Sequence, residues 1–103
     1  MNHTQPKFIL TKDGTLRFGL VRRHTELLMP DETCIGGGFY EVDIISHRLL
    51  LKGASSEYGE PAWEKTDRLK VHPHYLGLDI VYTSWNSWKK EIPISEMFEI
   101  VYE

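Results

Sequence analysis

Apolar residues recur at every second position over most of the chain, which is the period of β-strands rather than of helices. Two such runs, Lys7–Thr11 and Thr15–Val21, flank a turn at Lys12–Gly14. A three-residue loop with Gly14 in the left-handed conformation sets Leu10 opposite Leu16 and Phe8 opposite Phe18. A two-residue turn would move every side chain to the other face, so the apolar pattern predicts the bulged three-residue loop.

A second hairpin is predicted over Phe39–Ile45 and Arg48–Ala54, with its turn near Ser46 and His47. The apolar positions favour the pairs Ile44 with Leu49, Val42 with Leu51, and Tyr40 with Gly53 on one face. The same register sets Glu41 opposite Lys52 on the other face, a favourable cross-strand charge pair.

A third strand is expected over Leu76–Thr83, with Leu76, Leu78, Ile80 and Tyr82 pointing inward. Trp88–Ile94 is predicted as the return strand. Because Pro93 lacks an N–H group, this strand should lie at a sheet edge or end there. In the tail, Ser95 is expected to cap a helical turn through Phe98, followed by a short strand at residues 100–102.

These elements predict one mainly β or α+β domain over residues 1–103, in which antiparallel hairpins of about five to seven strands form a small barrel or sandwich. One or two short helical turns complete it, one of them at Thr25–Met29. The segments Arg23–Gly38 and Ser55–Pro73 have no regular pattern. Long loops are often functional, so we look for a site there.

Composition supports a folded globular domain, since 41% of the 103 residues are hydrophobic and 26% are charged. The formal net charge of −3 argues against nucleic acid as a partner. Cys34 is the single cysteine, and no secretory signal or membrane-spanning run is visible. We therefore expect a cytoplasmic protein without a membrane partner.

His72 and His74 are separated by one residue, a spacing that places both imidazoles on one side of an extended backbone. Neutral imidazole is a good ligand for zinc, and a metal site would need further ligands, for which Asp79, His47 and Cys34 are the candidates. This set supports an alternative hypothesis, a small metal-assisted hydrolase. The competing interpretation is that Pro73 sets a turn between two solvated histidines.

Two other features favour structural roles. Gly36, Gly37 and Gly38 lead into a strand rather than a helix, so we expect them to form a bulge or left-handed backbone rather than a phosphate loop. Cys34 lies beside Ile35 and is expected to be a small buried apolar side chain rather than a nucleophile.

Four aromatic residues lie in or beside loops, namely Tyr58, Trp63, Trp85 and Trp88. Such residues either provide contact area for a partner or cover the open ends of a small barrel. Our leading hypothesis is a non-enzymatic module that needs no cofactor and binds a protein partner or a second copy of itself. These aromatic residues would make the contact, with Glu57, Glu60 and Glu64 at its rim.

Overall fold

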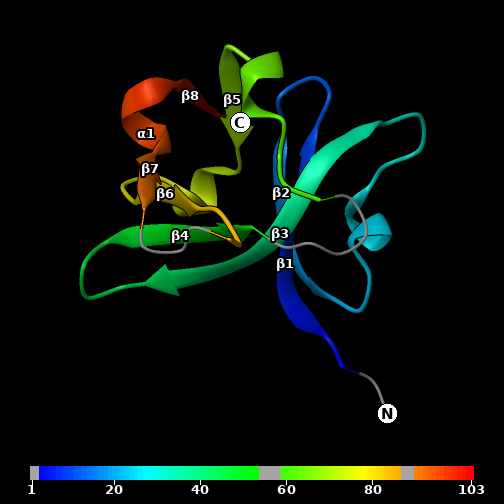
Figure 1. The fold of residues 1–103 in the computed structure, drawn as a ribbon, viewed down its shortest axis with the longest axis horizontal. Helices are drawn as coiled ribbons and strands as arrows, with labels where there is room; N and C mark the ends of the chain where they lie inside the picture. The colour runs from blue at the N-terminus through cyan, green and yellow to red at the C-terminus, as the bar shows by residue number, and fades with distance from the viewer. Residues whose placement is uncertain (1–2, 54–58, 87–89) are drawn as a thin grey trace.

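Eight β-strands and four short helical turns make up the part of the chain that the computed structural model describes, residues 3–53, 59–86 and 90–103 (Figure 1). The strands are β1 (Gln5–Thr11), β2 (Leu16–Val21), β3 (Cys34–Asp43), β4 (Arg48–Gly53), β5 (Arg68–Val71), β6 (Asp79–Thr83), β7 (Glu91–Pro93) and β8 (Glu99–Tyr102). The turns are η1 (His24–Leu27), η2 (Trp63–Lys65), η3 (Pro73–Tyr75) and α1 (Ile94–Met97). The mainly β prediction is confirmed, although the strands and the helical turns both exceed the predicted numbers.

The strands form a six-stranded sheet in the order β2-β1-β3-β4-β6-β7 and a two-stranded sheet of β5 and β8. Most neighbours are antiparallel, as predicted, but β4 pairs with β6 and β5 pairs with β8 in parallel. The first parallel pair arises because the connection through β5 and η3 returns the chain to the start of β4, where Arg48 pairs with Asp79. Sequence periodicity carries no information on such a distant pairing.

The first hairpin has the predicted register. Phe8 pairs with Phe18 and Leu10 with Leu16. Gly14 has a φ of 90° and donates its N–H to the Thr11 carbonyl at 3.0 Å, while Thr11 donates to the Thr15 carbonyl at 2.9 Å. The bulged three-residue loop is confirmed.

The second hairpin forms, but its predicted register is wrong by two residues. Val42 pairs with Leu49 and Tyr40 with Leu51, and residues 44–47 form a four-residue turn. A shift of two residues leaves each side chain on the same face, so the apolar pattern fits both registers equally. The Lys52 Nζ and Glu41 Oε2 atoms still form an ion pair at 2.9 Å, now along a diagonal of the ladder.

Strand β3 bends where it changes partners, pairing first with β1 and then with β4 (Figure 1). The bend lies at the three glycines. A Cβ on Gly37 would lie 2.6 Å from the Phe8 carbonyl oxygen, and one on Gly38 would lie 2.1 Å from that of Lys52. Gly36 has a φ of 141°, and the β1–β3 register shifts beside it. The expected structural role of these glycines is confirmed.

The third predicted strand begins later than expected, at Asp79, and Leu76 is 66% exposed. Pro73 and Gly77, which has a φ of 92°, divert the chain before it. The return strand β7 lies at the sheet edge and ends at Pro93, as predicted. Ser95 does not cap α1; it lies inside the turn, and its Oγ accepts a hydrogen bond from the Ile80 N–H at 2.7 Å.

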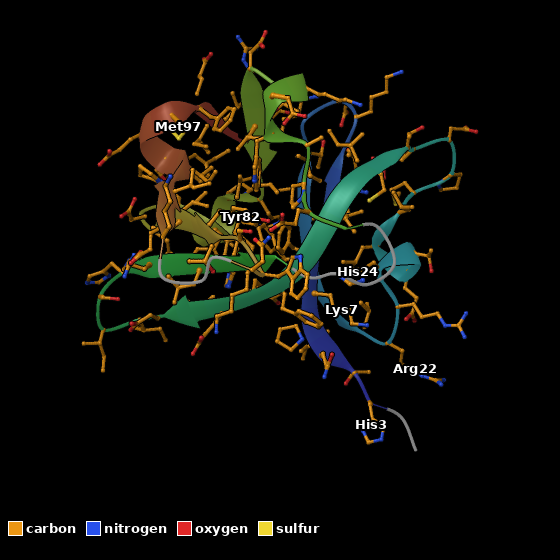
Figure 2. The ribbon with its side chains drawn as sticks, viewed as in Figure 1. His3, Lys7, Arg22, His24, Tyr82 and Met97 are labelled. Atoms are coloured by element: carbon orange, nitrogen blue, oxygen red, sulfur yellow. The ribbon has the colours of Figure 1, made fainter. Side chains whose placement is uncertain are left out.

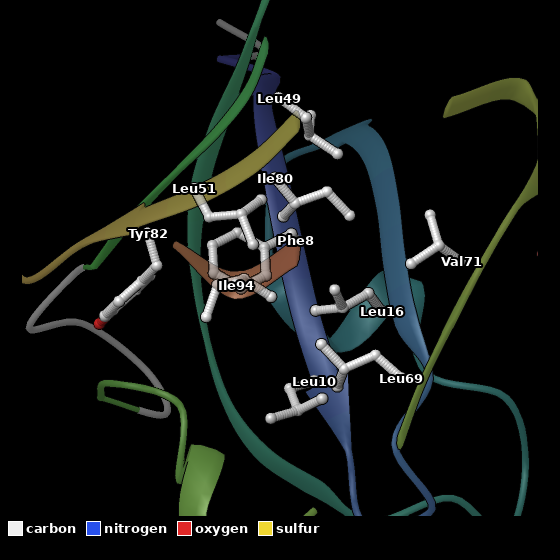
Figure 3. Close-up of a cluster of buried hydrophobic side chains, with 10 residues drawn as sticks. All are labelled: Phe8, Leu10, Leu16, Leu49, Leu51, Leu69, Val71, Ile80, Tyr82 and Ile94. Atoms are coloured by element: carbon white, nitrogen blue, oxygen red, sulfur yellow. The ribbon is translucent and has the colours of Figure 1, made fainter. Parts of the chain in front are cut away.

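Both sheets contribute to one apolar core (Figure 3), formed by Phe8, Leu10, Leu16, Leu49, Leu51, Leu69, Val71, Ile80, Tyr82 and Ile94. The two-stranded sheet meets β2 at one isolated bridge between Thr15 and Lys70, where the Lys70 N–H donates to the Gly14 carbonyl at 2.9 Å. Beyond this bridge β5 leads away into η3. The result is a barrel-like arrangement with an opening beside β2.

None of the helices in residues 3–53, 59–86 and 90–103 has the length and apolar character needed to cross a membrane.

Candidate functional site

The predicted aromatic surface falls partly outside the described residues, since Tyr58 and Trp88 are not among them. Trp63 is partly buried, and its ring packs against Tyr82 and Phe98 at centroid distances of 5.2 and 6.1 Å. Trp85 is 55% exposed. Trp63 therefore covers the core, whereas Trp85 keeps the exposure that a contact residue needs.

Glu60, predicted at the rim of that surface, joins two loops. Its Oε1 atom accepts hydrogen bonds from the Ser84 hydroxyl at 2.5 Å, and from the Tyr82 hydroxyl and the Trp85 N–H at 3.0 Å. These donors, the Ser84 hydroxyl first, lower the pKa of the Glu60 carboxyl. Of the other two rim residues, Glu64 is exposed in η2 and Glu57 lies outside the described residues.

The predicted metal ligands do not converge. The rings of His72 and His74 are 6.5 Å apart, and the His72 Nδ1 atom accepts the His74 backbone N–H at 3.0 Å. Asp79 lies in β6 beside Arg48, and its N–H donates to the His47 carbonyl. Over the described ranges of the chain, no three His, Cys, Asp or Glu side chains come close enough to hold a metal ion.

A groove with a volume of about 590 Å³ follows the opening beside β2. Residues 13 and 15–18 line it together with residues 70–72, 74 and 75, and Glu32 and Glu103 complete the lining. His72 and His74 thus lie in this groove, although Asp79 does not. Segments that are distant in the sequence form the groove because, within the described residues, the backbone pairing between them stops at the Thr15–Lys70 bridge.

Aromatic rings form the floor of the groove. The Phe18 ring lies 4.7 Å from the Tyr75 ring and 5.1 Å from the Tyr40 ring, measured between centroids. Burial, together with the neighbouring Tyr40 hydroxyl, raises the pKa of Tyr75 to about 12. The rings of Phe18 and Tyr75 therefore give the groove an apolar floor.

Two acidic side chains that line the groove, those of Glu32 and Asp13, already have partners. Glu32 forms a two-point ion pair with Arg17, with Arg17 Nη2 and Glu32 Oε2 at 2.9 Å, and also accepts the Met29 N–H at 2.8 Å. The Arg17 hydrogen bonds lower the pKa of Glu32. Asp13 accepts hydrogen bonds from Thr11 and Thr15 and lies 3.6 Å from the Lys70 Nζ, and the Thr11 bond is the largest cause of its lowered pKa.

The edge of β2 borders this groove. In the described part of the chain β2 pairs with β1 on one side, and on the other side the bridge to Lys70 is made by Thr15, the residue that precedes β2. The Thr11 N–H donates to the Thr15 carbonyl, so these two residues form a hydrogen-bonded pair. Hydrogen-bonded and non-hydrogen-bonded pairs alternate along an antiparallel ladder, so Phe18 and Leu20 direct their backbone N–H and C=O groups away from β1. Leu20 is also 69% exposed. The combination is an open strand edge beside an apolar floor.

Comparison with protein-family models, with curated proteins and with solved structures found no match to this chain.

Sequence reasoning did not identify the groove, because its two sides are joined by tertiary contacts alone. One signal was present. The apolar series Leu16, Phe18 and Leu20 exceeds what a two-stranded ribbon can bury, and Leu20 is the member left exposed.

Proposed function

We propose that the protein is a non-enzymatic binding module that takes up an extended segment of a partner protein along the edge of β2. The observation that carries this proposal is that, within the described residues, the outward backbone groups of Phe18 and Leu20 have no strand partner, and that Phe18 lines the groove. An added strand would complete the hydrogen bonds of that edge, and side-chain pockets beside it would select the sequence.

The surroundings of the edge favour uptake of a segment. Exposed sheet edges are usually protected by charges, prolines or covering loops. Here the uncharged residues Phe18 and Gly19 occupy the middle of β2, and the ion pair of Arg17 with Glu32 lies beside them. The floor of Phe18 and Tyr75 offers apolar contact to alternate side chains of the incoming strand.

A proline substitution tests the proposal directly. Leu20→Pro removes the outward N–H, and proline is compatible with an edge strand whose N–H faces solvent. Leu20→Thr is the matched control, because it shortens the apolar side chain and keeps the N–H. Peptides selected from a random phage-displayed library against the wild-type protein should bind the threonine variant and lose binding to the proline variant.

Amide exchange gives a second measurement that needs no variant. Binding of a selected peptide should slow exchange at the Phe18 and Leu20 amides of the wild-type protein. The proposal fails if the library returns no peptide, if peptides bind the proline variant equally well, or if the slowed amides lie elsewhere.

A further inference from the structure

We infer that the segment bound at β2 combines an apolar residue with acidic residues, and that Arg22 and Arg23 recognise the acidic part. This inference rests on the proposed function and adds to it the chemistry of the partner. It is carried by the charges at the end of β2, where Arg22 and Arg23 follow Val21 and are both exposed. Arg22 lies at the outer margin of the molecule in Figure 2.

The backbone beneath these two arginines is held in place. The Glu26 Oε2 atom accepts the Arg22 N–H at 2.9 Å and the Arg23 N–H at 2.7 Å, and the Lys7 Nζ donates to the Arg22 carbonyl. Lys7 is buried, with 8% of its surface exposed. The guanidinium groups thus project from a fixed platform, which reduces the conformational entropy lost on binding.

The charge at this end of β2 is unbalanced. In the part of the chain that the structure describes, the carboxylate that contacts this segment is that of Glu26, and it is engaged with the backbone N–H groups of Arg22 and Arg23. Among the described residues neither arginine side chain takes part in an ion pair. The whole chain has a formal charge of −3, so this cationic end is a local exception. Complementary charge at one end of an interface sets partner choice and strand direction.

The groove itself offers no comparable attraction to an acidic segment. Asp13, Glu32 and Glu103 all line it, and the neighbouring cations Arg17 and Lys70 are paired with Glu32 and Asp13. An acidic residue placed there would meet carboxylates. The apolar part of the segment therefore belongs over Phe18 and Tyr75, and the acidic part belongs beside Arg22 and Arg23.

The test uses a peptide from the library selection, resynthesised with tails of aspartate, asparagine or lysine at either end. Fluorescence anisotropy with the full chain should show the aspartate tail binding about fivefold tighter than the asparagine tail, and the lysine tail weakest. The peptide end at which the tail changes the affinity shows the direction in which the bound strand runs. High salt should reduce the preference.

Charge reversal provides the matching variants. The pair Arg22→Glu and Arg23→Glu should invert the order of the tails. The control pair Lys65→Glu and Lys90→Glu makes the same change in net charge at exposed lysines away from the groove and should leave the order unchanged. Circular dichroism and thermal unfolding establish that each variant is folded.

The possible failures are distinguishable. If all tails bind alike and the arginine variant behaves as wild type, while Leu20→Pro abolishes binding, the charge inference is wrong and the edge proposal stands. If the control pair inverts the order as well, overall charge rather than Arg22 and Arg23 explains the preference, and the inference is again wrong. If no peptide binds, or binding survives Leu20→Pro, both are overturned.

Discussion

The rings of Phe18 in β2 and Tyr75 in η3 lie 4.7 Å apart between centroids and meet at 53°. This contact spans the opening beside β2, where Tyr75 follows the two-stranded sheet and Phe18 belongs to the six-stranded one. It connects the two sheets at the place where backbone pairing between them has stopped. Phe18 and Tyr75 therefore line the groove and also hold its two sides together.

A double-mutant cycle should measure that shared contact. We expect Phe18→Leu and Tyr75→Leu to show a coupling of about 1 kcal/mol in the free energy of unfolding, because tilted aromatic pairs contribute beyond their buried area. Urea unfolding of the two single variants and the double variant gives the value. Phe18→Leu combined with Phe98→Leu, where Phe98 contacts Trp63 instead, is the control and should be additive within about 0.5 kcal/mol.

Tyr75 should also titrate unusually late. Its pKa in the folded state is raised to about 12 from an ordinary value of 10.0, so its stabilising contribution is complete below pH 10 and is lost as the pH rises through 12. Burial also raises the pKa of Tyr82 and of Tyr102, so tyrosinate absorbance should show several late-titrating groups, one of which Tyr75→Phe removes. Ionisation of that group near pH 10 in the folded protein would contradict the burial described for the groove floor.

Gly38→Ala should destabilise the protein by about 3 kcal/mol, because the added methyl group would meet the backbone carbonyl of Lys52 at 2.1 Å. Gly77→Ala is the comparison. No atom lies within 4 Å of a Cβ there, and its cost of about 1 kcal/mol comes from the φ of 92° alone. Thermal and denaturant unfolding rank the two variants, and equal losses would mean that β3 and β4 are not in close contact at Gly38.

Glu60→Gln should lower the free energy of unfolding by about 1 kcal/mol at neutral pH, because it removes the negative charge that accepts three hydrogen bonds. The loss stays small because Glu60 is exposed and solvent screens its charge. The pKa of Glu60 is lowered from its ordinary value of 4.5. Its contribution is therefore present above pH 4.5 and is lost as the pH falls through the lowered pKa. The stability of wild type and variant, followed from pH 7 to strong acid, should converge at the acidic end, and a constant gap would contradict the role given to the charge.

Local patterns allowed a large part of this fold to be predicted. The register of the first hairpin followed from Phe8, Leu10 and Gly14, because a one-residue slip would have exposed the apolar face. The register of the second hairpin did not follow, because a two-residue slip keeps each paired residue on the same face of the sheet. The observed register places Ile44 and Ile45 in the turn, where they are 76% and 95% exposed. Alternation in the sequence therefore predicts the sheet face on which a side chain lies more reliably than the residue with which it pairs.

The pairings between distant segments were beyond local reasoning. β5 lies in a polar stretch with no clear alternation, and its parallel partner β8 is the last strand of the chain. The groove forms because of that two-stranded sheet. The spacing of His72 and His74 is visible in the sequence, but their position in the groove is not. Trp63 was placed beside a partner surface for its polar neighbours, yet its ring lies against Tyr82 and Phe98 in the interior.

The bend of β3 has a consequence for how the molecule opens. The first half of β3 pairs with β1 and its second half pairs with β4. We therefore expect the hydrogen bonds of these three strands to open together. Their amides should exchange with solvent as one cooperative unit at the free energy of global unfolding, whereas the short strand β7, held by β6 alone within the described residues, should open earlier. Local opening in the native state should therefore occur at β7 rather than at β1, the strand that pairs with the binding edge β2.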